Sequence, residues 1–103
     1  MFLWVDDLRK PPSDKYVWAK SVHEAIIHIC QMTCPDGTHN IAVLDLDHDA
    51  GDYAWQGGDY IEILEWMEQK GIDDIPIHLH TMNPVGRENM RRIIQYNGWK
   101  QIY

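Results

Sequence analysis

The sequence predicts an α/β fold built on a mainly parallel sheet, and three observations support this. Short apolar runs alternate with helical patterns along the 103 residues, an order typical of parallel strands joined by crossover helices. The run at residues 41–44 has no polar alternation, which suits a strand buried on both faces. Acidic or imidazole side chains follow three of the apolar runs, where an open α/β sheet forms its ligand crevice.

The local pattern indicates five strands and three helices in one domain over residues 1–103. We expect strands near residues 2–5, 16–20, 41–44, 75–79 and 100–103. Residues 6–14 contain Pro11 and Pro12, so the first crossover is expected to be a loop rather than a helix. The prediction is a five-stranded, mainly parallel sheet in the order 2-1-3-4-5, with helices on both faces.

Capping signals place the helix ends. Ser21 and Glu24 form a capping box that starts the first helix. The second is expected at residues 59–70, with Gly71 just beyond its end. Asn83 followed by Pro84 is typical of a third helix start, and that helix is expected to run to about residue 97.

Composition limits the classes of function. The formal net charge of −7 disfavours a general DNA- or RNA-coating surface, because such proteins usually have a basic face. No apolar stretch approaches the ~20 residues of a membrane span, so no membrane association is expected. Residues 2–5 are too short for a signal-peptide core, which predicts a cytoplasmic location.

The acidic residues at the first and third strand ends are candidate metal ligands. Asp6 and Asp7 leave the first strand, and adjacent residues of a strand point to opposite sides. Alternation in an extended segment would place Asp45, Asp47 and Asp49 on one side and His48 on the other. We expect Asp6, Asp7, Asp45 and Asp47 to hold a divalent cation, with Mg²⁺ or Mn²⁺ favoured and Zn²⁺ as an alternative.

Two histidines at the fourth strand are candidates for proton transfer. His78 and His80 share a face of an extended strand, and His80 lies at its end. An imidazole there suits metal ligation or proton transfer near pH 7. His48 is the other candidate, and Asp47 is counted with both histidines as a candidate catalytic residue.

The start of the third expected helix is a candidate anion site. Free amides and the positive end of the helix dipole favour an anion near Asn83. Gly86 would let a ligand approach the backbone, and Arg87 offers a planar fork for phosphate.

Three sequence blocks resemble the cyclic-phosphate-processing receiver domain family. They are Trp-Val-Asp-Asp-Leu-Arg-Lys-Pro-Pro at 4–12, Leu-Asp-Leu-Asp-His-Asp at 44–49, and His-Leu-His-Thr-Met-Asn-Pro-Val-Gly-Arg-Glu-Asn-Met at 78–90. The resemblance spans nearly the whole chain and implies a receiver-like (flavodoxin-like), three-layer fold. Phosphoacceptor receivers are similar at Asp6, Asp7, Asp45 and Thr81, but they have a lysine at the end of the fifth strand, whereas Lys100 comes at its start.

These observations give three functional hypotheses. The first is metal-assisted processing or hydrolysis of a cyclic phosphate on RNA ends or nucleotides, with Thr81, Asn83, Gly86 and Arg87 binding the phosphate. The second is a receiver-like module that senses a phosphate ligand without turnover. The third is a phosphoacceptor receiver of a signalling relay, with Asp45 as the nucleophile.

Overall fold

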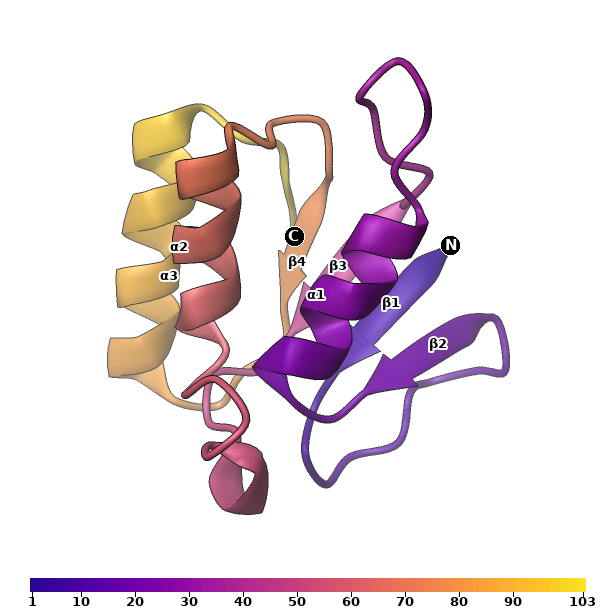
Figure 1. Ribbon diagram of the computed structural model, residues 1–103. Helices are drawn as coiled ribbons and strands as arrows, with labels where there is room; N and C mark the ends of the chain where they lie inside the picture. Colours follow the sequence, from indigo (N-terminus) through magenta and orange to yellow (C-terminus); the bar gives the residue numbers. More distant parts are fainter.

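The computed structural model describes all 103 residues and consists of a parallel sheet with three α-helices (Figure 1). The strands are β1 (Phe2–Val5), β2 (Tyr16–Ala19), β3 (Val43–Leu46), β4 (Ile77–Leu79) and β5 (Gln101–Ile102). The helices are α1 (Val22–Gln31), α2 (Ile61–Lys70) and α3 (Pro84–Asn97), with a short 3-10 turn, η1 (Gly51–Tyr53). All neighbouring strands pair in parallel in the order β2-β1-β3-β4-β5, which confirms the predicted sheet and the loop in place of the first crossover helix.

The third strand lies two residues further along the chain than expected. β1 begins at Phe2, and Phe2 pairs with Val43. Residues 41 and 42 therefore have no partner in β1. β3 therefore extends to Leu46 and includes Asp45. An acidic residue is tolerated inside this strand because two histidines donate hydrogen bonds to its carboxylate.

Most of the predicted helix signals are confirmed. The Ser21 hydroxyl accepts a 3.1 Å hydrogen bond from the amide of Glu24 at the start of α1. The Asn83 side chain accepts one of 3.0 Å from the amide of Gly86 at the start of α3. α2 ends at Gly71, whose φ of 69° is the left-handed conformation that favours glycine.

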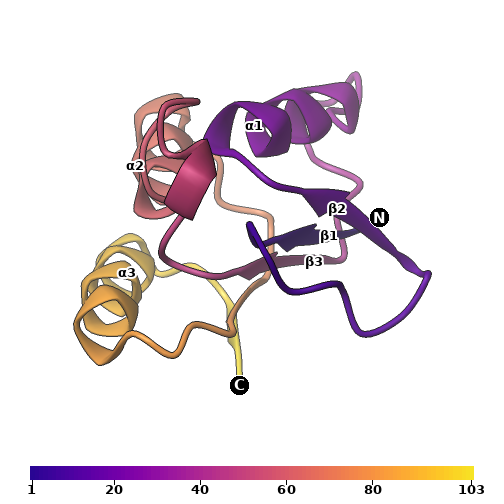
Figure 2. The same ribbon diagram turned by 90° about the horizontal axis from the view of Figure 1, so that it is seen from below.

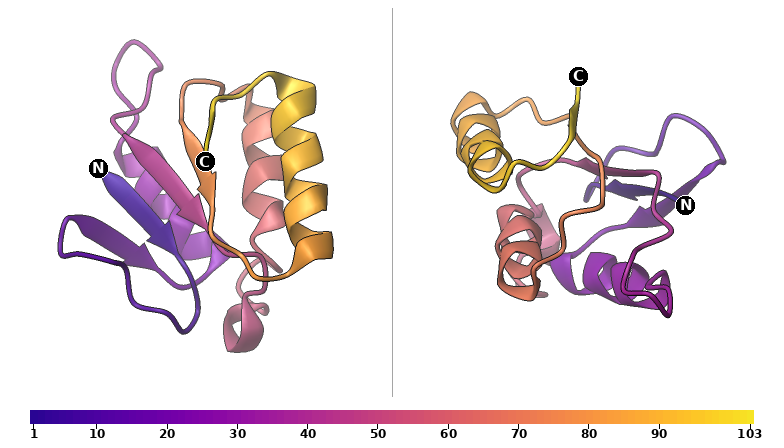
Figure 3. Two further views of the ribbon diagram at one scale, coloured as in Figure 1. Left: turned by 180° about the vertical axis from the view of Figure 1, so that it is seen from behind. Right: turned by 90° about the horizontal axis from the view of Figure 1, so that it is seen from above.

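All three helices lie on one face of the sheet (Figures 2 and 3). The crossovers from β2 to β3, β3 to β4 and β4 to β5 advance in the same direction across the sheet, so right-handed connections place their helices on the same side. The β1 to β2 connection runs the other way, and it is the loop at residues 6–15. The expected helices on both faces are therefore not formed within residues 1–103, which make two layers rather than three.

The core fills the covered face, and the other face carries aromatic side chains. Strand residues of the covered face pack with the buried stripes of the helices; they include Leu3, Val5, Leu44, Leu46, Ile77 and Leu79. On the other face, the Tyr16 ring lies 5.5 Å from Phe2 and 5.8 Å from Trp4 between centroids. No helix combines the length and apolar character needed to cross a membrane.

Candidate metal centre

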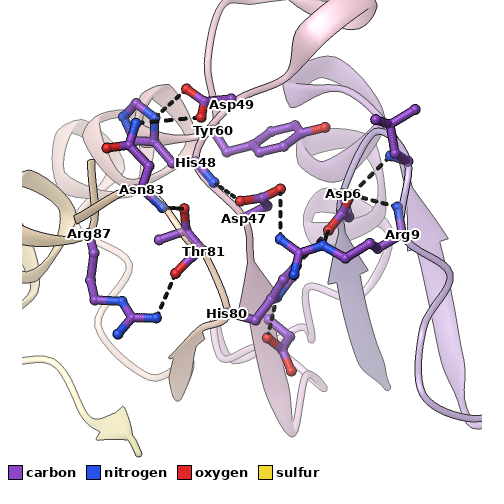
Figure 4. Close-up of polar contacts among 12 residues, drawn as sticks. Asp6, Arg9, Asp47, His48, Asp49, Tyr60, His80, Thr81, Asn83 and Arg87 are labelled. Atoms are coloured by element: carbon purple, nitrogen blue, oxygen red, sulfur yellow. Dashed lines mark hydrogen bonds and ion pairs between the residues drawn. The ribbon is translucent and has the colours of Figure 1, made fainter. Parts of the chain in front are cut away.

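Three strands bring one side chain each to a common point at the carboxyl edge of the sheet. Asp6 follows β1, Asp47 follows β3 and His80 follows β4, and one ligand atom from each lies within 4.8 Å of the others (Figure 4). We call these three residues the strand-end triad. The parallel order explains their convergence, because the carboxyl ends of parallel strands meet at one edge.

Asp6 is the most strongly held carboxylate of the strand-end triad. Its Oδ1 accepts hydrogen bonds from the amides of Leu8 (2.9 Å) and Arg9 (2.8 Å), and its Oδ2 lies 2.9 Å from Nε2 of His80. Burial by itself raises the pKa of this carboxyl group, but the two amides and His80 outweigh burial, so the pKa is lower than usual. Asp6 is therefore ionised and fixed in place by its own turn.

His80 is held on two sides. Its Nδ1 lies 2.7 Å from Oδ1 of Asp45, and its ring stacks on Trp4 with centroids 3.8 Å apart and planes 3° apart. A carboxylate only accepts hydrogen bonds, so Asp45 selects a ring that carries a proton on Nδ1. That arrangement directs Nε2 towards Asp6, and it is the usual way in which a carboxylate orients a metal-binding histidine.

Asp47 faces the other two members from β3. Its Oδ1 accepts a 2.8 Å hydrogen bond from the amide of His48, and its Oδ2 lies 3.5 Å from the guanidinium of Arg9. The same guanidinium lies 3.3 Å from Oδ2 of Asp6, and about half of its side chain is exposed. Arg9 thus places a positive charge beside both carboxylates. Sequence reasoning missed Arg9; the i, i+3 spacing from Asp6 after a strand is the signal that would have indicated it.

Two of the expected metal ligands lie outside the strand-end triad. Asp45 stands behind His80, where its Oδ1 also accepts a hydrogen bond from Nδ1 of His78 (2.8 Å). Asp7 points towards Gly51, at which an added Cβ would come 2.3 Å from its Oδ2. Burial, followed by repulsion from nearby carboxylates that include Asp6 and Asp47, raises the pKa of Asp7.

A second histidine–aspartate group lies beside the first. His48, Asp49 and Asp59 also place ligand atoms within 4.8 Å of one another, and we call them the loop triad. Nδ1 of His48 lies 2.9 Å from Asp49, while the Asp59 carboxylate accepts a hydrogen bond from the amide of Ala50. The expected alternation fails here because the strand ends at Leu46, so Asp49 does not join Asp47.

The four expected phosphate-binding residues cluster at the start of α3, but most of their polar groups already have partners (Figure 4). The Thr81 hydroxyl accepts a hydrogen bond from the amide of Asn83, whose side chain caps Gly86. The space beside Gly86 is filled by the His48 ring, because a Cβ there would lie 2.4 Å from its Cγ. Arg87 points away from this helix start and donates a 2.5 Å hydrogen bond to the carbonyl of Thr81. The structure therefore does not gather the four residues around one open anion site.

Comparison with known proteins identifies the family. The sequence model of the cyclic-phosphate processing receiver domain matches residues 1–96. The chain belongs to this family. No curated protein and no solved structure matches the chain.

In this cyclic-phosphate processing receiver domain, the donor set of the strand-end triad fits a divalent cation. Two carboxylates and an imidazole that presents Nε2 are ligands of Mn²⁺, Zn²⁺ or Fe²⁺, whereas Mg²⁺ prefers oxygen ligands alone. The histidine therefore moves the expectation from Mg²⁺ towards Mn²⁺ or Zn²⁺. The ionised state of Asp6 and the orientation of His80 both precede any cation, because the protein's own hydrogen bonds establish them.

Proposed function

We propose that this receiver domain opens a cyclic phosphate on an RNA end or a nucleotide, with a divalent cation held by Asp6, Asp47 and His80. The observation that carries the proposal is the convergence of two carboxylates and an oriented imidazole within 4.8 Å at the carboxyl edge of the sheet. The family description, cyclic-phosphate processing, supports the choice of substrate.

Arg9 is the group that we assign to the phosphate. A chain with a net charge of −7 repels an anion unless a local cation attracts it, and the half-exposed Arg9 guanidinium lies beside both carboxylates of the strand-end triad. Its five donors suit two phosphoryl oxygens at once. With Asp6 and Asp47 holding a cation, the Arg9 guanidinium would be free to turn towards the substrate.

The reaction is an in-line displacement at phosphorus. A water oxygen forms a bond to phosphorus as the water gives up a proton, one ring P–O bond breaks, and the released alkoxide takes up a proton, which leaves a phosphate monoester. The cation would lower the pKa of the attacking water and stabilise the developing negative charge. Arg9 would hold the phosphoryl oxygens so that the bond to be broken lies opposite the attacking oxygen.

This assignment takes the metal-ligation alternative for His80 and gives His48 no part in proton transfer. We assign His80 to the cation rather than to proton transfer, because Asp45 holds Nδ1 and the contact of Nε2 with Asp6 would be exchanged for one with the cation. His48 turns its ring towards Asp49 and Gly86 and contributes its backbone amide to Asp47. Asp45 is a positioning residue for His80.

Phosphorus NMR of a 2′,3′-cyclic nucleotide tests the proposal. We expect the cyclic signal to convert to a monophosphate signal with Mn²⁺ or Zn²⁺ present, and not after chelation. Asp47→Asn should abolish this conversion, whereas Asp49→Asn, a matched change in the loop triad, should leave most of it. Cation-dependent nucleotide binding without conversion would contradict an enzymatic role and favour a phosphate-sensing module.

A further inference from the structure

A cavity lies where α3 meets the β4–β5 edge, and none of its lining residues belongs to either triad. Its volume is about 300 Å³, at the lower end of the range for ligand pockets, which is roughly 300–1,000 Å³. Its lining is His78, Leu79, Arg87, Arg91, Gln101, Ile102 and Tyr103. Two of the nine lysines and arginines in an acidic chain therefore meet at one cavity, and no Asp or Glu side chain lines it.

The cationic groups of this cavity keep donors free. Arg87 uses one terminal nitrogen for the Thr81 carbonyl, and no carboxylate pairs with it. Arg91 uses Nε and one terminal nitrogen for Glu88, which leaves its other terminal nitrogen unbonded. The His78 side chain is one-third exposed, and its Nε2 makes no hydrogen bond within the protein. The two guanidinium groups around one cavity form a set of donors suited to a phosphate group, and the His78 ring forms part of the cavity wall.

One side chain connects this cavity to the strand-end triad. A single oxygen of Asp45 accepts from Nδ1 of His78 (2.8 Å) and from Nδ1 of His80 (2.7 Å). The cavity wall and the candidate cation ligand are therefore separated by one carboxylate. Asp45 therefore links the cavity to the strand-end triad.

We propose that the cavity lined by Arg87, Arg91 and His78 binds a second phosphate group of the ligand. That both phosphates belong to one ligand rests on the proposed function; that the cavity binds phosphate does not. The substrate class is then a nucleotide or RNA end that carries a further phosphate besides the reacting one.

Calorimetric titration with inorganic phosphate, without added metal, tests the cavity itself. Arg87→Gln and Arg91→Gln should each weaken binding roughly tenfold to a hundredfold, because each removes charge-assisted hydrogen bonds. Arg92→Gln is the matched control: Arg92 also pairs with Glu88 but does not line the cavity, so wild-type affinity is expected. Glu88→Gln should strengthen binding, because it frees the whole Arg91 guanidinium. Phosphate affinity that is unchanged in both Arg87→Gln and Arg91→Gln would overturn the proposal, even if Asp47→Asn abolishes turnover.

A pair of nucleotides tests the link between the two positions. Adenosine 3′,5′-bisphosphate should bind at least tenfold more tightly than adenosine 3′-monophosphate in the presence of Mn²⁺, and Arg91→Gln should erase the difference. Equal affinities of wild type for the two nucleotides would show that the cavity takes a free ion and would overturn the assignment to a second phosphate of the ligand.

Discussion

The strand-end triad and the loop triad contain the same residue types, two aspartates and a histidine, but the fold treats them differently. In each triad, the three ligand atoms lie within 4.8 Å of one another. The strand-end triad is assembled from three strands, and its aspartates and histidine are almost fully buried. In the loop triad, Asp49 is 61% exposed and pairs with the residue before it. Proximity alone therefore does not separate a candidate cation site from an acidic turn.

What separates the two triads is support from surrounding residues. Asp45 and Trp4 hold the His80 ring, and two backbone amides hold Asp6. In the loop triad, the His48 ring hydrogen-bonds to Asp49, which is itself a triad member and is 61% exposed. A cation site needs ligands whose orientation is fixed before the cation arrives. We therefore propose the strand-end triad as the cation site, and the following changes test that choice.

The largest effect is expected from removing the aromatic support of His80. Trp4→Ala should lower the free energy of unfolding by about 3–5 kcal/mol, because it deletes a buried ring that stacks on His80 and bonds the carbonyl of Arg9. Trp55→Ala, at a side chain that is 79% exposed, should change it by less than about 0.5 kcal/mol. Urea unfolding of both variants makes the comparison. An equal loss of unfolding free energy in the two variants would mean that Trp4 does not support the site.

A smaller effect, on cation affinity, is expected from Asp45. Asp45→Asn should weaken Mn²⁺ binding roughly tenfold to a hundredfold, the range found when a residue that orients a metal ligand is replaced. The amide retains the size of the side chain but loses the charge that selects Nδ1–H on His80. Calorimetry measures the change. A complete loss of binding would instead make Asp45 a direct ligand, as the sequence suggested.

The sequence predicted the sheet well because its signals are local. The apolar runs, the capping pair of Ser21 and Glu24, and Asn83 before Pro84 all act within a few residues. The sheet order follows from the placement of crossover helices. The absence of a helix layer on the second face also follows from that order, the loop in place of the first crossover helix and the right-handed crossover rule, and the expectation of helices on both faces did not apply that rule.

The candidate site was predicted in composition but not in arrangement. The sequence indicated Asp6, Asp47 and His80, but it could not show that Asp45 faces a histidine instead of the cation position. That outcome depends on the parallel register that pairs Asp45 with His78. Arg9 was missed although its i, i+3 spacing from Asp6 was visible, because the position of its guanidinium depends on the turn that Asp6 forms.

Arg9 should compete with the cation. Arg9→Gln removes a positive charge that lies 3.3 Å from Asp6, and a half-exposed ion pair contributes about 0–1 kcal/mol. Mn²⁺ affinity should therefore rise, by up to about fivefold, while conversion of the cyclic nucleotide falls. Lys10→Gln is the control for a general change in charge. Weaker Mn²⁺ binding in Arg9→Gln would contradict competition.

The smallest effect is expected far from both triads. His39 donates a 2.6 Å backbone hydrogen bond to Asp74, and its ring lies 2.8 Å from the same carboxylate. Burial raises the pKa of Asp74, but the contacts with His39 outweigh burial and lower it. A lowered carboxyl pKa stabilises the fold above the ordinary pKa of 3.8, and the contribution is lost as the pH falls through the folded-state pKa. Asp74→Asn should therefore destabilise the protein by about 0.5 kcal/mol or less at pH 7.

Thermal melts should show that this difference shrinks below about pH 4. A difference between wild type and Asp74→Asn that grows as the pH falls would contradict a lowered pKa of Asp74. Mn²⁺ should bind Asp74→Asn as it binds wild type, since Asp74 lies outside both triads.

The central claim, that the strand-end triad rather than the loop triad holds the cation, is tested most directly by Mn²⁺ binding to Asp47→Asn and Asp49→Asn. The two changes are chemically identical and lie two residues apart. Titration followed by the electron paramagnetic resonance signal of free Mn²⁺ should show at least a hundredfold loss in Asp47→Asn and less than a threefold loss in Asp49→Asn. The reverse order, or wild-type affinity in Asp47→Asn, would contradict the claim.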